Sequence, residues 1–137
     1  MIILASSSPR RIELLKTLYD DFKIIKPTFD ESLISKDDKD LALKESYEKG
    51  KSILNPTYFN DLIISADTIV RLNNKVYGKP KDKNEAITFL KELSNNTHEV
   101  VTGYSLFFKG KVISKQVVTY VTFNCLNEEQ IIKYVNN

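Results

Sequence analysis

The stretch Leu4-Ala5-Ser6-Ser7-Ser8-Pro9-Arg10-Arg11 decides how the fold begins, because it joins the end of an apolar run to the start of a helix. The residues from Ile2 to Ala5 form a short apolar run that predicts a buried strand. Ser8 is a good N-cap, and Pro9 is a good first helical residue because its missing N–H has no helical partner to lose. We therefore expect a strand, a serine turn and a helix over about residues 9–19.

The two arginines of this stretch stand at an unfavourable end of the predicted helix. Arg10 and Arg11 would lie in the first turn, where the helix dipole is positive and disfavours cations. A bound anion would offset this cost, since free N–H groups, serine hydroxyls and two guanidinium groups can converge on a phosphate. Two solvated arginines on a surface helix are the alternative. The local chemistry leaves both interpretations open.

Outward from this stretch, strand-like and helix-like segments alternate along the chain. Further strands are expected over about residues 22–25, 62–70, 75–77, 98–109 and 111–124. Further helices are expected over about residues 38–54, from Asp82 with Glu85 as capping-box partner, and from Asn127 with Gln130 in that role. Asn73-Asn74 and Gly110 mark hairpin turns. This order predicts one α/β domain over residues 1–137, a layered fold with a mixed twisted sheet flanked by helices.

Composition narrows the class of protein. The chain has 137 residues, 42% hydrophobic residues and a net charge of +2, so no strong field favours nucleic acid or an acidic membrane. No apolar run is long enough to span a bilayer. The only cysteine, Cys125, is expected to be half-buried in a strand, and the only histidine, His98, to be structural. These features indicate a protein of a reducing, cytoplasmic environment, with no nucleic-acid or membrane partner.

Three charged positions are candidates for chemistry. Asp67 directly follows the apolar run Leu62–Ala66, and a carboxylate there is costly to bury without partners, which favours a catalytic or metal-binding role over a turn cap. Lys79 lies between Gly78 and Pro80 on a stiff loop that suits either a phosphate contact or a plain exposed turn. Glu31, in Asp30-Glu31-Ser32, is either solvated or a metal ligand.

Taken together, these segments resemble the Maf family of nucleoside triphosphate pyrophosphatases. The similarity covers nearly the whole chain, in the family order, through Leu4–Arg11, Asp30–Ser32, Ser65–Val70, Gly78–Asp82 and positions between Leu93 and Gly103. The resemblance implies a fold similar to Maf and inosine-triphosphatase proteins. It also implies metal-dependent hydrolysis of a nucleoside triphosphate to the monophosphate and pyrophosphate. The Ser-Pro-Arg-Arg and Ala-Asp-Thr motifs resemble the branch that acts on dTTP and UTP.

The resemblance also implies roles for single residues. Asp67 matches the family's proton acceptor, and with Glu31 it would bind a divalent metal, Mg²⁺ or alternatively Mn²⁺. The positions that would bind the substrate are Ser8, Arg10, Arg11, Lys49, Thr68 and Lys79. Arg10 and Thr68 are linked to base selection, and Lys51 is a rival to Lys49. This set suits attack on an α-phosphorus, which needs a base, a positioned water and cations near the leaving group.

The chain departs from the family pattern at its C-terminal end. Family members continue into a segment that carries a base-selecting glutamine, whereas this chain stops at Asn137 and is either a fragment or a natural short form. Without that segment we expect an exposed sheet edge and self-association, for example as a homodimer. We also expect turnover at least about tenfold slower than that of a full-length relative.

Two classes of function follow. The first is a house-cleaning pyrophosphatase for pyrimidine nucleoside triphosphates. The alternative is a catalytically weak nucleotide-binding regulator of cell division, and metal-dependent release of pyrophosphate separates the two. A nucleic-acid-binding domain is disfavoured by the balanced charge.

Overall fold

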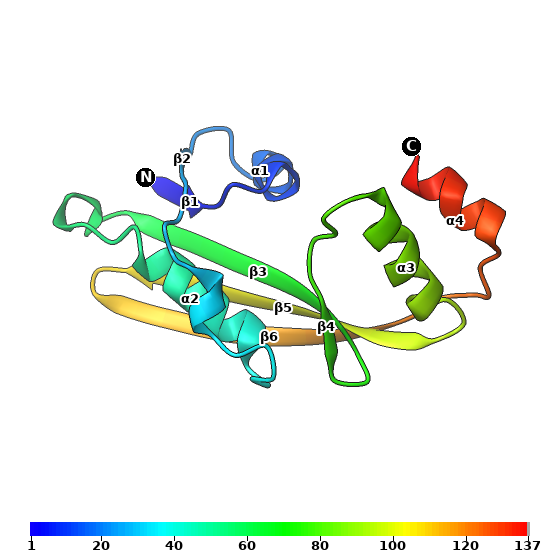
Figure 1. Ribbon diagram of the computed structural model, residues 1–137. Coiled ribbons are helices and arrows are strands. Elements are labelled where there is room, and N and C mark those ends of the chain that lie inside the picture. The colour runs from blue at the N-terminus through cyan, green and yellow to red at the C-terminus, as the bar shows by residue number, and fades with distance from the viewer. Residues whose placement is uncertain (137) are drawn as a thin grey trace. The chain divides into compact units, whose positions relative to one another are not determined.

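The computed structural model describes residues 1–136 and contains six strands, four α-helices and two short 3-10 helices within them. The strands are β1 (Ile2–Ala5), β2 (Lys23–Ile25), β3 (Leu62–Leu72), β4 (Lys75–Tyr77), β5 (Thr97–Phe108) and β6 (Lys111–Thr122). The helices are α1 (Pro9–Lys16), η1 (Glu31–Leu33), α2 (Leu41–Lys51), η2 (Pro56–Tyr58), α3 (Lys83–Leu93) and α4 (Glu128–Val135) (Figure 1). The strands and α-helices follow the order that the sequence predicts.

All six strands belong to one mixed sheet. Their spatial order is β2-β1-β3-β5-β6, and β4 pairs with β3. Strand β1 runs parallel to both neighbours, with Ala5 opposite Ile25 on β2 and Ser65 on β3. Strands β3 and β4 are antiparallel, and the turn between them places Asn73 and Asn74 at φ 50° and 69°. The predicted layered α/β fold with a mixed sheet is confirmed.

Two compact units divide the described chain. Unit 1 comprises residues 1–68 and 102–117, and unit 2 comprises residues 69–101 and the chain from Val118 onward. Strands β3, β5 and β6 each contribute residues to both units. The single domain over residues 1–137 stays a prediction, and each unit is described by itself below.

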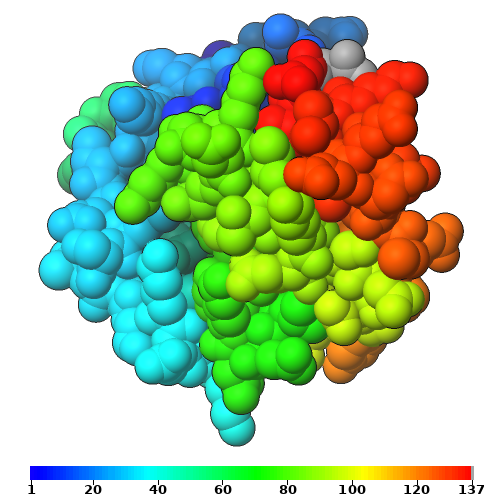
Figure 2. All heavy atoms as spheres, turned by 45° about the vertical axis from the view of Figure 1, so that its right-hand side comes forward, coloured from blue at the N-terminus to red at the C-terminus, as the bar shows by residue number. Residues whose placement is uncertain are grey.

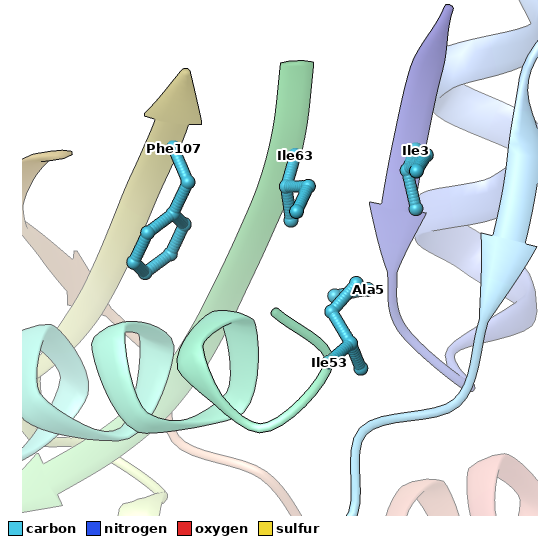
Figure 3. Close-up of a cluster of buried hydrophobic side chains, with 5 residues drawn as sticks. All are labelled: Ile3, Ala5, Ile53, Ile63 and Phe107. Atoms are coloured by element: carbon cyan, nitrogen blue, oxygen red, sulfur yellow. The ribbon is translucent and has the colours of Figure 1, made fainter. Parts of the chain in front are cut away.

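The core of unit 1 forms where the strands of the sheet meet the end of α2. Figure 3 shows the side chains of Ile3 and Ala5 from β1, Ile63 from β3 and Phe107 from β5, with Ile53 just after α2. Each of these side chains is at most 8% exposed. The near-continuous apolar run of β1 therefore matches a strand buried within the sheet.

Helix α2 approaches strands β3 and β5 closely because small residues line its buried face. A Cβ atom at Gly50 would lie 2.2 Å from the ring of Phe107, and one at Gly103 would lie 2.1 Å from the carbonyl oxygen of Ala42. The hydroxyls of Ser46 and Ser105 lie 2.9 Å apart across the same contact. The close packing therefore depends on missing or small side chains, and on buried hydroxyls that hydrogen-bond each other.

This contact corrects the face that the sequence indicated for the helix. The expected apolar edge consisted of Leu41, Leu43, Tyr47 and Ile53, but Leu43 and Tyr47 are only partly buried. The buried helical residues are Leu41, Ala42, Glu45, Ser46 and Gly50. Leu41 and Ile53 are buried as expected and Tyr47 packs against the core, but hydrophobicity did not identify Ser46 and Gly50, whose small size lets the helix approach the strands.

Unit 2 contains helices α3 and α4, which contact each other (Figure 2). The predicted capping box of α4 is present in full between Asn127 and Gln130. At α3 the side chain of Asp82 accepts a hydrogen bond from the N–H of Glu85, but the Glu85 carboxylate accepts from the N–H of Lys81 instead. Local capping signals thus located both helix starts.

Several element limits differ from those predicted. Helix α1 ends at Lys16 rather than near residue 19, and the N–H groups of Thr17 and Leu18 donate to carbonyl oxygens only three residues back. The second helix spans Leu41–Lys51 rather than about residues 38–54. Cys125 is exposed and lies between β6 and α4, not half-buried in a strand. Among the helices of residues 1–136, none has the length and apolar character needed to cross a membrane.

Candidate functional site

The register of β1 and β3 places Asp67 beyond the end of β1. Ala5, the last residue of β1, lies opposite Ser65, so β3 continues past β1 through Asp67 and Thr68. The chain leaves β1 at the same edge and enters the serine turn before α1. Ligands of α/β proteins commonly bind at the carboxyl ends of parallel strands. The topology of unit 1 therefore brings the two leading sequence motifs together.

The serine turn and the start of α1 form as the sequence predicts. The hydroxyl of Ser6 accepts a hydrogen bond from the N–H of Ser8 at 3.0 Å. Ser8 in turn is the N-cap, and its hydroxyl accepts from the N–H of Arg11 at 3.4 Å. Pro9 occupies the first helical turn. The Ser8 hydroxyl is thus engaged in holding the helix start.

The two arginines have different surroundings. Arg10 is exposed, whereas Nη2 of Arg11 donates a hydrogen bond to the hydroxyl of Thr68 at 3.0 Å. The Thr68 hydroxyl also lies 3.3 Å from that of Thr102 on β5. Burial lowers the pKa of the Arg11 guanidinium. Arg11 is therefore held against Thr68 within β3, and of the two arginines Arg10 is the solvated one.

Lys49 of α2 joins two of the predicted acidic residues. Its Nζ lies 3.0 Å from Oδ1 of Asp67 and 2.5 Å from Oε1 of Glu31. Asp67 is 9% exposed, while Glu31 is exposed. The rival lysine, Lys51, lies 5.8 Å from the ring centroid of Tyr47. Of the two lysines, Lys49 is the one in contact with the carboxylates.

Sequence reasoning missed one acidic residue at this place. Glu45 is 7% exposed, lies on α2 and joins Glu31 and Asp67 in a group of carboxylates. Burial and then the neighbouring Glu31 carboxylate raise the pKa of Glu45 above its usual range. The available signal was its spacing from Lys49, since residues four apart share a helix face.

The residues present fit a divalent metal ion. Carboxylate oxygens of Glu31, Glu45 and Asp67 all lie within 4.8 Å of one another. Such an all-oxygen group suits a hard cation such as Mg²⁺. Because the group also contacts Lys49, it offers an acid–base residue, a cation and metal ligands in one place.

The predicted site residues are distributed over both units. Unit 1 contains Ser8, Arg10, Arg11, Glu31, Lys49, Asp67 and Thr68. Direct contacts join Lys49 to Glu31 and Asp67, and Arg11 to Thr68. Lys79 belongs to unit 2, where it is exposed on the segment between β4 and α3. With the hydrogen bond from Arg11 to Ser8, the contacts link six of the seven unit 1 residues, all except Arg10, into two groups joined by the peptide bond between Asp67 and Thr68.

Comparison with known proteins gives a consistent result. The model of the family described as Maf-like protein matches residues 1–137. A dTTP/UTP pyrophosphatase of Thermosipho africanus (strain TCF52B) is 45% identical over 135 residues, which cover 98% of this chain and 69% of that protein. A dTTP/UTP pyrophosphatase of Clostridium botulinum (strain Loch Maree / Type A3) is 44% identical over 143 residues, which cover 98% of this chain and 73% of that protein. With a family match over its whole length and relatives of this similarity, the chain belongs to the Maf family.

Proposed function

We propose that the protein hydrolyses dTTP and UTP to the corresponding monophosphate and pyrophosphate. The observation that supports this proposal is the largely buried Asp67, whose carboxylate forms an ion pair with Lys49 at 3.0 Å. The next residue, Thr68, accepts a hydrogen bond from Arg11. The names of the relatives support the nucleotide pair. Attack of water on a phosphoanhydride needs a general base and nearby cations, and Asp67, Lys49 and Arg11 can provide them.

Asp67 would act as the general base. Its carboxylate takes a proton from water, the water oxygen forms a bond to the α-phosphorus, and the bond from this phosphorus to the bridging oxygen breaks. Pyrophosphate leaves with the electron pair of that bond, and the proton stays on Asp67 until solvent removes it. Lys49 holds the carboxylate in position through its ion pair, so that the base meets the water in a fixed geometry.

The remaining residues would bind the nucleotide. Arg11 and Arg10 supply guanidinium groups to the phosphates, and Ser8 keeps the intervening turn in shape through its cap. Lys79 is a further phosphate contact, and Thr68 and Arg10 contribute to base selection, as the family resemblance implies. The hydrogen bond from Arg11 to Thr68 at 3.0 Å supports coupling between phosphate binding and base selection. A phosphate that binds Arg11 would also change the hydrogen bonding of Thr68.

Glu31 and Asp67 would hold the divalent metal, for which Mg²⁺ is proposed first and Mn²⁺ second. When bound, such an ion neutralises phosphate charge and polarises a phosphoryl oxygen. The closeness of the carboxylate oxygens, all within 4.8 Å, supports this assignment.

The test is an assay of products. The 137-residue chain is incubated with Mg²⁺ and dTTP, UTP, CTP or GTP, and the products are separated by anion-exchange chromatography. We expect monophosphate and pyrophosphate from dTTP and UTP, and no reaction after the metal is chelated. Orthophosphate with a nucleoside diphosphate would contradict the proposed bond cleavage. Binding of dTTP without any turnover would instead support the regulator.

A further inference from the structure

Glu45 is a largely buried acidic residue that has no role in the proposed mechanism. Its side chain is 7% exposed on the buried face of α2. Within residues 1–136, its carboxylate accepts no hydrogen bond and forms no ion pair with a lysine or arginine. Burial makes an ionised Glu45 unfavourable, and the charges of Lys49 and Lys36 act on it without forming an ion pair.

The position of this carboxylate points to what could be its partner. An oxygen of Glu45 lies within 4.8 Å of oxygens of both Glu31 and Asp67. The Lys49 ammonium contacts these two carboxylates at 2.5 and 3.0 Å and is not in ion-pair contact with Glu45. Three carboxylates outnumber Lys49 and Lys36, the two lysines whose charges act on Glu45, so the group keeps an excess of negative charge when all three are ionised. A divalent cation among the three oxygens would neutralise that excess.

We propose that Glu45 is a third carboxylate ligand of the divalent cation, beside Glu31 and Asp67. This inference rests on the proposed function, since it concerns the cation of the same site. A third anionic oxygen strengthens the binding of a hard cation, because affinity rises with the number of charged ligands. Lys49 would compete with the cation, since it occupies the same carboxylates when no metal is bound.

The experiment measures Mn²⁺ binding to the 137-residue chain in the absence of nucleotide. Free Mn²⁺ is followed by electron paramagnetic resonance, for the wild type, Glu45→Gln and Glu48→Gln. Glu48 is the matched control, because the same charge is removed from the same helix, beside Lys44 and Tyr47 rather than in the carboxylate group. We expect Mn²⁺ binding to weaken at least about tenfold in Glu45→Gln and to change less than about twofold in Glu48→Gln.

A purely structural role of Glu45 would give a different pattern. Without metal, Glu45→Gln is expected to melt at the same or a higher temperature than the wild type, because it removes a buried charge. Added Mn²⁺ should raise the melting temperature of the wild type more than that of the variant. If Glu45→Gln does not fold, Glu45→Asp, which keeps the charge on a shorter side chain, is expected to bind Mn²⁺ more weakly than the wild type.

Two results would overturn the inference. One is unchanged Mn²⁺ affinity in Glu45→Gln, or in Glu45→Asp if only this variant folds, which would make Glu45 a neutral buried acid. The other is a wild-type chain that binds no Mn²⁺ at millimolar concentration without nucleotide. Failure of the proposed function is separately visible, because Mn²⁺ binding that depends on Glu45 can occur in a chain that releases no pyrophosphate.

Discussion

The two units of the chain bury different kinds of residue. Among residues 1–136, the buried polar or charged residues of unit 1 are Ser6, Glu45, Ser46, Ser65, Asp67 and Ser105. In the described part of unit 2 the only such residue is His98, whose ring packs on Phe123 with centroids 4.8 Å apart. Unit 1 thus buries more polar and charged residues than the described part of unit 2, although Nδ1 of His98 in unit 2 is buried without a hydrogen-bond partner.

The difference separates residues that serve the fold from residues that serve a site. The buried serines of unit 1 satisfy one another or the backbone, as when Ser65 donates to the carbonyl oxygen of Ser46 at 2.6 Å. Asp67 has a charged partner instead, and Glu45 has no hydrogen-bonding partner within the described residues. Unit 2 follows local rules, such as the complete capping box at Asn127. Buried charge without a structural explanation is therefore the better indicator of function.

The largest effect is expected where the buried charge is removed. Asp67→Asn should lower the rate of pyrophosphate release by about 10²–10⁴-fold, the usual cost of losing a general base. The fold should persist because Lys49 keeps its ion pair with Glu31. Steady-state kinetics and circular dichroism measure both quantities.

Asp61→Asn is the matched control for Asp67→Asn. Asp61 directly precedes β3 and pairs with the N-terminal ammonium at 3.1 Å. An exposed pair of this kind contributes little, so its loss should leave activity within about twofold of the wild type. Equal activity of Asp67→Asn and Asp61→Asn would show that the buried carboxylate is no more important for catalysis than the exposed one.

A smaller effect, on stability, should follow from adding a methyl group at the tight contact of unit 1. In Gly50→Ala the new Cβ would lie 2.2 Å from the Phe107 ring and 2.6 Å from the Ser65 hydroxyl. Such overpacking should lower the free energy of unfolding by about 1–3 kcal/mol. Gly78→Ala in unit 2 is the control, since beyond its two chain neighbours no atom of the described residues lies within 4 Å of the added Cβ, and its effect should stay within about 0.5 kcal/mol. Urea denaturation of both variants tests whether close packing is specific to unit 1.

The smallest effect is expected for a helix cap of unit 2. Asn127→Ala removes the side-chain oxygen that accepts from the N–H of Gln130 at 2.8 Å. Loss of such a cap usually lowers the free energy of unfolding by about 1 kcal/mol. Asn124→Ala, at an exposed position outside the helix, should have almost no effect. Similar denaturation midpoints for the two variants would show that local capping does not stabilise unit 2.

Much of the fold was predictable because its signals are local. The Asn73-Asn74 turn has both residues at positive φ, as expected for a two-residue hairpin, and Ser8 caps α1 as predicted. The β5–β6 hairpin turns at Lys109 and Gly110, also at positive φ. In each case the backbone conformation depends on residues within four positions, so the sequence contains the necessary information.

The candidate site was predictable only in part. Motif resemblance selected Asp67, Glu31 and Lys49, and the structure brings these three into contact. It did not select Glu45, because no motif contains it and a glutamate in a charged helix resembles a solvated one. The exposure of Cys125 and the small residues on the buried face of α2 were likewise not predicted. These properties depend on which distant strands lie against a residue.

The sequence by itself determined the order of strands and helices, the turns and caps, and membership of the Maf family. Each follows from short-range spacing or from a set of short motifs in a fixed order. Only the tertiary structure decided that α2 presents Gly50 and Ser46 to the strands, which turns Glu45 and Lys49 toward Asp67. The physical reason is that burial and charge pairing arise between residues far apart in the chain, so they exist only once the sheet and helix have packed.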